Sequence, residues 1–162
     1  MRILIVDDEP KVRENLKAMI ADVPGFTVTG CATDGVEALE MLSDGTYDAL
    51  ITDIRMPRMN GLELIREVRR REIMAVCMIL SGYDDFDYAK TAMQLGVQHY
   101  LLKPVDEDEL KNVLDQAKAE FEKQINLQSL LQQKTLAQRE RDLIHLLHGQ
   151  RVEMKAALPP GS

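Results

Sequence analysis

Tyr47-Asp48-Ala49-Leu50-Ile51-Thr52-Asp53-Ile54-Arg55-Met56-Pro57 is an apolar run that ends abruptly in a carboxylate followed by a turn. An apolar run of this length, rich in β-branched residues, is typical of a strand that is buried on both faces of a parallel sheet. We therefore interpret residues 47–52 as a central strand. Asp53 directly follows the carboxyl end of this predicted strand.

Four more apolar runs alternate with segments of helical periodicity in the first 120 residues. Pro10 opens the first helix, and pairs at capping-box spacing precede three others, namely Asp34 with Glu37, Asn60 with Glu63, and Asp106 with Glu109. A short helix over 84–95 is closed by Gly96. The five predicted strands are 2–6, 26–32, 47–52, 74–80 and 98–102. This alternation predicts an open α/β fold, a parallel sheet with helices on both faces.

Ligands bind such sheets at the carboxyl ends of the strands, where the predicted strands present Asp7, Asp8, Asp53, Ser81 and Lys103. Two carboxylates about 4 Å apart repel by roughly 4 kcal/mol at an effective dielectric near 20. Lys103 supplies one positive charge, and the natural complement is a hard divalent cation such as Mg²⁺. The set is typical of phosphoryl transfer: Asp53 would be the nucleophile, and Lys103 and the Ser81 hydroxyl would contact the phosphoryl oxygens.

Aspartates that follow strands are also common turn formers, and we give that structural role to Asp34, Asp44 and Asp48. Cys31 and Cys77 lie in apolar runs and are predicted to be small core residues rather than redox centres.

Four blocks of the chain resemble the signature motifs of two-component response-regulator receiver domains. They are Val6-Asp7-Asp8-Glu9, Asp53-Ile54-Arg55-Met56-Pro57 with Gly61, Leu80-Ser81-Gly82-Tyr83, and Tyr100-Leu101-Leu102-Lys103-Pro104. The resemblance covers residues 1 to about 120, in order and at the family's usual spacing. It implies a flavodoxin-like (βα)5 sandwich with parallel strand order 2-1-3-4-5, and an aspartyl phosphate accepted from a sensor histidine kinase with Mg²⁺.

The resemblance also assigns roles at the strand ends. Asp7 and Asp8 would organise the Mg²⁺ ion, Asp53 would be phosphorylated, and the main-chain carbonyl of Arg55 would complete the protein ligands. A receiver of this kind is a signalling phospho-acceptor that assists its own phosphorylation and dephosphorylation, rather than an enzyme with a separate substrate.

The resemblance further predicts how the signal is read. Ser81 and Tyr100 match the family's switch pair, a hydroxyl that moves toward the phosphoryl group and a ring that rotates inward. Arg55 and Tyr83 occupy positions that tune dephosphorylation. The bond between Lys103 and Pro104 is often cis in this family.

The sequences of residues 52–57 and 81–90 are especially similar to the corresponding sequences of receivers whose output is an AraC-type DNA-binding domain. Nothing after residue 120 offers the paired helices of a DNA reader, so we expect a receiver at 1–120, a helical linker at 121–148 and a flexible tail or residual cloning sequence at 149–162. The output would then be transcription regulation through a domain that this sequence lacks.

From Glu107 to about His148 the chain contains no Pro or Gly and is predicted to form one long helix. A weak heptad pattern runs along it, and its first half could instead pack on the receiver itself. A separate apolar patch around Leu143 and Leu147 needs a partner, so we expect a homodimer through this final helix. His145 and His148 share a helix face and are predicted to be surface residues. The two heptad rows are Leu110, Ala117, Gln124 and Leu131, and Leu114, Phe121, Gln128 and Thr135.

Composition excludes several classes of function. The 162 residues carry a net charge of −7, with Arg69-Arg70-Arg71 as the one basic run, so direct nucleic-acid binding is not expected. No stretch has the length of a transmembrane segment or the form of a signal peptide, so a cytoplasmic location is expected. Two alternative functions remain: an interaction or dimerisation module with a vestigial acidic site, and an aspartyl-phosphate phosphatase.

Overall fold

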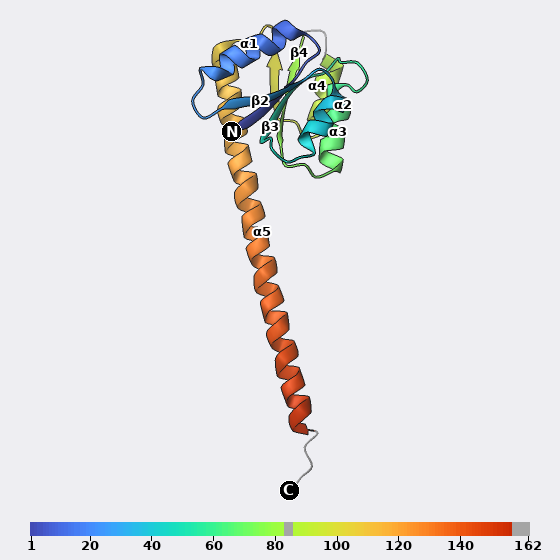
Figure 1. Ribbon diagram of the computed structural model, residues 1–162, viewed down its shortest axis with the longest axis vertical. Helices are drawn as coiled ribbons and strands as arrows, with labels where there is room; N and C mark the ends of the chain where they lie inside the picture. The colour runs from blue at the N-terminus through green and yellow to red at the C-terminus, as the bar shows by residue number, and fades with distance from the viewer. Residues whose placement is uncertain (83–85, 157–162) are drawn as a thin grey trace. The chain divides into compact units, whose positions relative to one another are not determined.

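The computed structural model describes residues 1–82 and 86–156, and these form ten elements. Strands and helices alternate along the chain (Figure 1). In order they are β1 (Arg2–Val6), α1 (Pro10–Ala21), β2 (Thr27–Ala32), α2 (Gly35–Leu42), β3 (Ala49–Asp53), α3 (Gly61–Arg70), β4 (Val76–Ser81), α4 (Phe86–Gln94), β5 (His99–Leu102) and α5 (Glu107–Ala156). The chain divides into two compact units, Met1–Phe121 and the segment from Glu122 onward.

The first unit contains one parallel sheet with the strand order β2-β1-β3-β4-β5. This order confirms the predicted flavodoxin-like topology. Every residue of β3 and β4 is buried, which explains why these strands appear in the sequence as continuous apolar runs. The order reverses between β1 and β3, so their carboxyl ends form the crevice where a ligand would bind.

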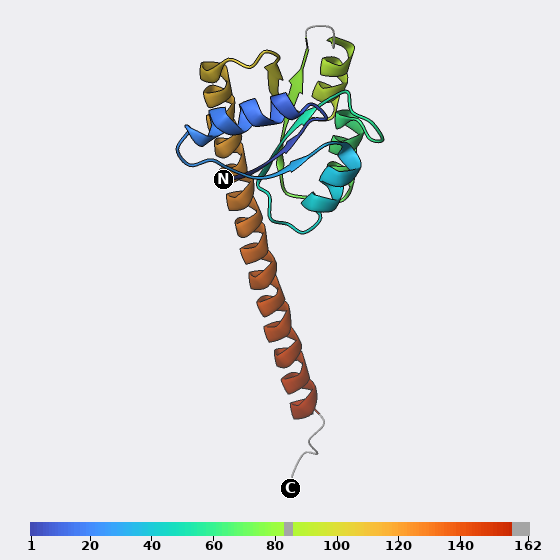
Figure 2. The same cartoon turned by 45° about the horizontal axis from the view of Figure 1, so that its top comes forward.

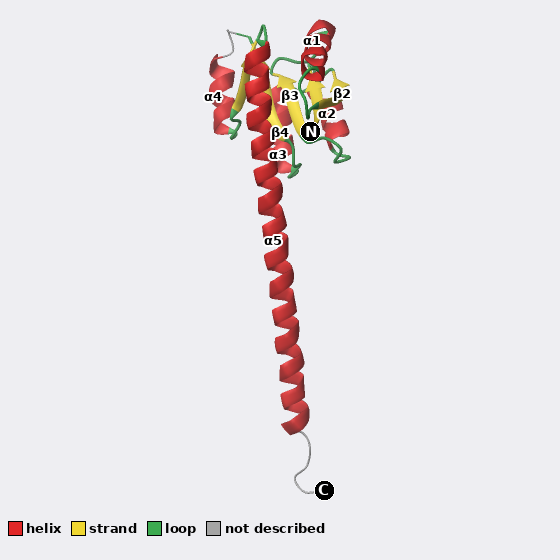
Figure 3. Ribbon diagram, turned by 90° about the vertical axis from the view of Figure 1, so that its left-hand side faces the viewer, coloured by secondary structure: helices red, strands yellow, loops and turns green. Residues whose placement is uncertain are grey.

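Helices cover both faces of the sheet, as Figures 1 and 2 show for the first unit. The helices α2, α3 and α4 bury Leu39, Ile65 and Ala92 against one face. On the other face, α1 contributes Leu16 and the first part of α5 contributes Leu114. Figure 3 shows the yellow strands between these red helices. The three-layer arrangement buries the central strands β3 and β4 completely, whereas the edge strand β2 stays partly exposed.

Side-chain caps begin three of the helices, as the sequence predicted. The Glu37 N–H donates to Asp34 Oδ1 over 2.9 Å, and the Glu109 N–H donates to Asp106 Oδ2 over 3.0 Å. At α3, Asn60 and Glu63 form a reciprocal capping box. Such caps satisfy N–H groups that the helix itself cannot, and so fix where α2 and α3 begin relative to the strand ends.

Strand boundaries differ from the prediction in a way that matters for the site. The strand β3 starts at Ala49 and includes Asp53, and β4 starts at Val76 and includes Ser81. Parallel pairing continues past the apolar run on each strand, because Asp53 pairs with Leu80 in the sheet register. Both polar residues are therefore strand residues with a backbone held by its neighbours.

The final helix also ends later than expected. It was predicted to stop near His148 and runs instead to Ala156, so residues 149–156 are helical rather than part of a tail. A single glycine, Gly149, costs a helix only about 1 kcal/mol relative to alanine, which its neighbours offset. Residues 157–162 lie outside the described part of the chain.

Within the first unit, Leu110, Leu114 and Ala117 of α5 are buried against the sheet. The first half of the heptad pattern is thus used for packing inside the domain, which is the alternative that the sequence left open. In the second unit, large apolar side chains of the described residues are exposed. They are Ile125, Leu127, Leu130, Leu131, Leu136, Leu143, Ile144, Leu146 and Leu147. No helix in the described ranges combines the length and apolarity needed to cross a membrane.

Gly61 lets α3 begin directly against β3. A Cβ atom added at Gly61 would lie 2.1 Å from the main-chain oxygen of Asp53, and the Gly61 N–H donates to the carbonyl of Ile54 over 2.8 Å. A clash between two backbones cannot be relieved by rotating a side chain. Glycine is therefore required at position 61 for steric reasons, and a larger residue there would displace the backbone of Asp53.

We predict that Gly61→Ala destabilises the domain by about 1–3 kcal/mol, the usual cost of overpacking a tight site. Urea unfolding followed by circular dichroism measures this change. Gly82→Ala is the matched control, because a Cβ there meets nothing within 4 Å, and its stability should be close to wild type. Equal stability of the two variants would contradict the steric argument.

Candidate functional site

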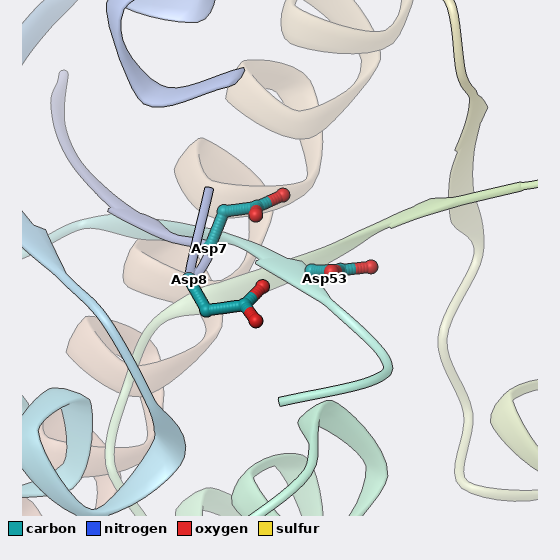
Figure 4. Close-up of side chains that lie close together, drawn as sticks. All are labelled: Asp7, Asp8 and Asp53. Atoms are coloured by element: carbon teal, nitrogen blue, oxygen red, sulfur yellow. The ribbon is translucent and has the colours of Figure 1, made fainter. Parts of the chain in front are cut away.

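Three carboxylates come together at the carboxyl ends of β1 and β3. Asp7, Asp8 and Asp53 each offer an oxygen, and these oxygens all lie within 4.8 Å of one another. Figure 4 shows the three side chains pointing to the same side. Asp7 is fully buried, Asp53 is 7% exposed, and Asp8 is exposed. The cluster therefore has a buried floor and one carboxylate at its open rim.

Local hydrogen bonds orient the two buried carboxylates. Asp7 Oδ1 accepts from the N–H of Glu9 over 2.9 Å, and Asp53 Oδ1 accepts from the N–H of Ile54 over 2.8 Å. Each aspartate thus uses one oxygen to fix the turn that follows its strand. The other oxygen, Oδ2, is left to face the shared site.

Lys103, in the connection from β5 to α5, brings a positive charge to these oxygens. Its Nζ lies 3.0 Å from Asp7 Oδ2 and 3.4 Å from Asp53 Oδ2. The contact with Asp7 is an ion pair without hydrogen-bond geometry. Asp7 Oδ2 is buried, and it accepts no hydrogen bond within the described chain. The Lys103–Pro104 peptide bond is cis, as the family resemblance predicted.

One lysine does not balance three carboxylates. Burial, and then the charge of Asp7, raise the pKa of Asp53 to about 6, against the opposing effect of Lys103 and the Ile54 N–H. Burial acts to lower the pKa of Lys103, but its pairing with Asp7 and Asp53 outweighs burial and raises it. At neutral pH Asp53 is therefore mostly ionised and Lys103 is charged.

The predicted switch residues flank this cluster. Ser81 is fully buried at the end of β4, and its hydroxyl donates to the carbonyl of Gly82 over 3.1 Å. Tyr100 is half-buried on β5, where it packs against the cluster formed by α2, α3 and α4. The structure thus brings Ser81 to the strand end next to Asp53 and puts Tyr100 on the neighbouring strand.

Arg55 is exposed on the loop after Asp53, and its guanidinium stands 5.7 Å from the ring centre of Tyr88 on α4. Both residues line an open hollow of 360 Å³ together with Asp8 and Asn60. The sequence contains no signal for the contact with Tyr88, because the two residues are far apart along the chain. Tyr83, the other predicted tuning residue, lies outside the described residues.

Residues that were predicted to be structural have such roles. Asp34 caps α2, Asp48 pairs with Arg2 at 3.1 Å, and Asp44 accepts from Thr46. Cys77 is buried, and burial raises the pKa of its thiol to about 11, so it is an unreactive core residue.

Comparison with known proteins agrees with the geometry. The model of the family described as response regulator receiver domain matches residues 3–115. An uncharacterized response regulatory protein of Staphylococcus epidermidis is 44% identical over 115 residues, which cover 70% of this chain and 45% of that protein. The transcriptional regulatory protein YesN of Bacillus subtilis is 38% identical over 124 residues, covering 76% of this chain and 34% of YesN. The chain matches less than half the length of these relatives.

Solved structures are similar as well. The receiver domain of AraT, a response regulator from Geobacillus stearothermophilus, has a TM-score of 0.68 and 36% identity, with 76% of this chain and 96% of that chain covered. The fold and the strand-end acidic cluster are those of a flavodoxin-like α/β domain. The chain belongs to the response regulator receiver domain family, whose members signal in two-component systems.

We predict that Asp53→Asn stabilises the metal-free domain by up to about 3 kcal/mol at pH 7.5, the order set by its raised pKa at about 1.36 kcal/mol per pKa unit. Folding raises the pKa of Asp53 from 3.8 to about 6, so the ionised group disfavours the folded state. This penalty is complete above pH 6, declines as pH falls, and is absent below about pH 4. The gain from Asp53→Asn should therefore shrink at pH 4.5, as measured by urea unfolding in EDTA.

Asp48→Asn is the matched control for this measurement. Despite the opposing effect of burial, the hydrogen bonds and charge of Arg2 lower the pKa of Asp48, so removing its charge should destabilise the domain at pH 7.5. A destabilising effect of Asp53→Asn at pH 7.5 would contradict the electrostatic account of the site.

Proposed function

We propose that Asp53 accepts a phosphoryl group from a phosphohistidine of a sensor histidine kinase, in a reaction that requires Mg²⁺. A carboxylate oxygen of Asp53 forms the new bond to phosphorus as the bond between phosphorus and the imidazole nitrogen breaks. The electron pair of that bond stays with the departing imidazole. The observation that carries the proposal is the convergence of three carboxylates and one lysine at the carboxyl ends of β1, β3 and β5.

The donor set fits Mg²⁺. Asp7, Asp8 and Asp53 are hard oxygen donors, and the buried Asp7 Oδ2 has, among the described residues, only its ion pair with Lys103. We assign Asp7, Asp8, Asp53 and the main-chain carbonyl of Arg55 as the protein ligands, the last of these by family resemblance. When bound, Mg²⁺ supplies positive charge that neutralises phosphoryl oxygens.

Three residues of the chain are assigned to the acceptor oxygen and to contacts with the phosphoryl oxygens. Asp53 is ionised at neutral pH and held by Ile54, so it is oriented before the phosphoryl group arrives. Lys103 already lies within 3.4 Å of Asp53 Oδ2 and can transfer its contact to a phosphoryl oxygen. The Ser81 hydroxyl, buried at the end of β4 beside Asp53, is assigned to another phosphoryl oxygen.

We propose that Ser81 and Tyr100 report the phosphorylated state. Movement of the Ser81 hydroxyl toward the phosphoryl group opens space on the α4 side of the sheet, and the Tyr100 ring turns into it. Ser81 lies on β4 and Tyr100 on the neighbouring strand β5, where Tyr100 is opposite Ile79 of β4. Arg55 and Tyr83 are proposed to tune how fast the phosphoryl group is lost.

The proposed output is transcription regulation in the cytoplasm. Relatives include the transcriptional regulatory proteins YesN and HptR, which extend well beyond the matched segment. We propose that a DNA-binding domain outside this sequence reads the switch, and that this chain does not itself bind nucleic acid. The net charge of −7 supports the second point.

The decisive prediction concerns the acceptor. Incubation with a small-molecule phosphodonor and MgCl₂ should give a single, base-labile phosphoryl adduct by intact mass, and EDTA should prevent it. Asp53→Asn should give none, whereas the control Asp48→Asn should label like wild type, because Asp48 pairs with Arg2 away from the site. Labelling of Asp53→Asn equal to wild type would refute the proposal. Catalytic turnover without an adduct would favour the phosphatase alternative.

We further propose that the second unit mediates homodimerisation. In the described residues from Glu122 onward, large apolar side chains such as Leu127, Leu131, Ile144 and Leu147 are exposed. An isolated helix has no other element on which to bury them, and a second copy of the helix is a partner of matching length and chemistry. The polar stretch between the two apolar groups supports a loosely coupled pair rather than a continuous seam.

Replacing Ile144 and Leu147 together by Gln should weaken the dimer by at least about a hundredfold, since each buried Leu or Ile contributes roughly 1.5–3 kcal/mol. Sedimentation equilibrium over a range of concentrations measures the dissociation constant. The control, Lys134→Gln with Arg141→Gln, removes no apolar side chain and should dimerise nearly as wild type. A monomeric wild-type protein at high concentration would remove this proposal.

A further inference from the structure

The loop between β3 and α3, residues 54–60, is held from both sides. On one side the Gly61 N–H bonds the carbonyl of Ile54, as described above. On the other side the Gly35 N–H donates to the carbonyl of Met59 over 3.1 Å, which ties the loop to the start of α2. A Cβ at Gly35 would lie 2.7 Å from Met59 atoms, so loop and helix touch directly.

Arg58 occupies the centre of this loop in a backbone conformation that arginine rarely adopts. Its φ is +64°, in the left-handed region where a side chain crowds the following carbonyl. Nothing in the local sequence requires this: the preceding residue is proline and the position is not a glycine. A tight turn closed by the Met59 N–H, which donates to the carbonyl of Pro57 over 2.8 Å, sets the backbone here, and a second contact holds the side chain.

That contact is with Asp34. Arg58 Nη2 lies 2.6 Å and Nε 2.8 Å from Asp34 Oδ2, while Asp34 Oδ1 caps α2 through the N–H of Glu37. The Asp34 side chain is only 6% exposed, so the guanidinium meets a carboxylate whose position is already determined. The Arg58 side chain itself is 61% exposed, so what distinguishes this pair is the fixed position of the carboxylate that the guanidinium meets.

We propose that Arg58 is a positioning residue for phosphoryl acceptance, which anchors the β3–α3 loop to Asp34 and thereby holds Arg55 and Asp53 in the arrangement that binds the cation. The loop leaves the sheet at Asp53 and carries Arg55 before it reaches the anchor at Arg58. Loss of the anchor frees the loop at the point of its backbone strain. The effect reaches the site through the main chain, without any contact between Arg58 and the phosphoryl group.

The inference rests on the proposed function for its Mg²⁺ and phosphorylation readouts, but its first test needs neither. In EDTA, amide hydrogen exchange of Gly35 and Gly61 reports the two hydrogen bonds that hold the loop. Arg58→Ala should accelerate exchange at both glycines. Arg2→Ala is the matched control, because it breaks the remote ion pair with Asp48 and should leave both glycines protected.

The second test measures Mg²⁺ affinity by calorimetry with MgCl₂. Arg58→Ala should bind Mg²⁺ about three- to tenfold more weakly, less than the roughly 10- to 100-fold typical of groups that touch a metal ligand directly. Asp34→Asn keeps the α2 cap but loses the charge, and should show a similar loss. Arg58→Lys should recover part of the affinity, and Arg2→Ala should bind as wild type.

The outcomes separate the two proposals. If wild type binds Mg²⁺ and is phosphorylated, while Arg58→Ala and Asp34→Asn match it in affinity, rate and glycine exchange, the positioning role is wrong and the proposed function stands. If wild type fails to bind Mg²⁺ or to be phosphorylated, the proposed function fails. Faster exchange at Gly35 and Gly61 with unchanged Mg²⁺ affinity would also overturn the inference, since the anchor would then be structural only.

Discussion

The crowding of negative charge at the carboxyl ends of β1 and β3 is the constraint on which the site depends. Asp7, Asp8 and Asp53 bring their oxygens within 4.8 Å, and Lys103 contacts only the two buried members of the group. Such an arrangement is costly in an isolated domain, because burial and like charge both disfavour ionised carboxylates. A bound cation would relieve this repulsion, which is why the cluster supports the proposed Mg²⁺ site.

The scaffold keeps these charges in place by burying almost everything else. Strand β3 is enclosed on both faces, and its last residue, Asp53, is still paired in the sheet. Close backbone packing at Gly61 and the anchor from Arg58 to Asp34 then fix the loop that follows. The proposed movement of the Ser81 hydroxyl is compatible with this rigidity, because a hydroxyl rotates about one bond without disturbing the strand that carries it.

The segment from β5 into α5 joins the site to the rest of the protein through covalent continuity. Within a short stretch it carries Tyr100, then Lys103, and then the buried Leu110 and Leu114 of the helix. A change of charge at Asp53 acts on Lys103 directly, and a turn of the Tyr100 ring alters the same strand. The exposed apolar residues beyond Glu122 are the part of this helix on which the proposed dimer rests, since Leu110, Leu114 and Ala117 are already packed in the first unit.

Local chemistry in the sequence was enough to predict a parallel α/β sheet with Asp7, Asp8, Asp53, Ser81 and Lys103 at its strand ends, because buried parallel strands and capped helices leave strong short-range patterns. The strand order came from the resemblance to receiver domains. The sequence could not separate the heptad residues that pack inside the domain, such as Leu114, from those left exposed, such as Leu131, because both obey one helical period. Nor could it reveal that Arg58 meets Asp34 or that Arg55 meets Tyr88. Those contacts join residues from different elements, and only the packing of the sheet and its helices decides which surface side chains become neighbours.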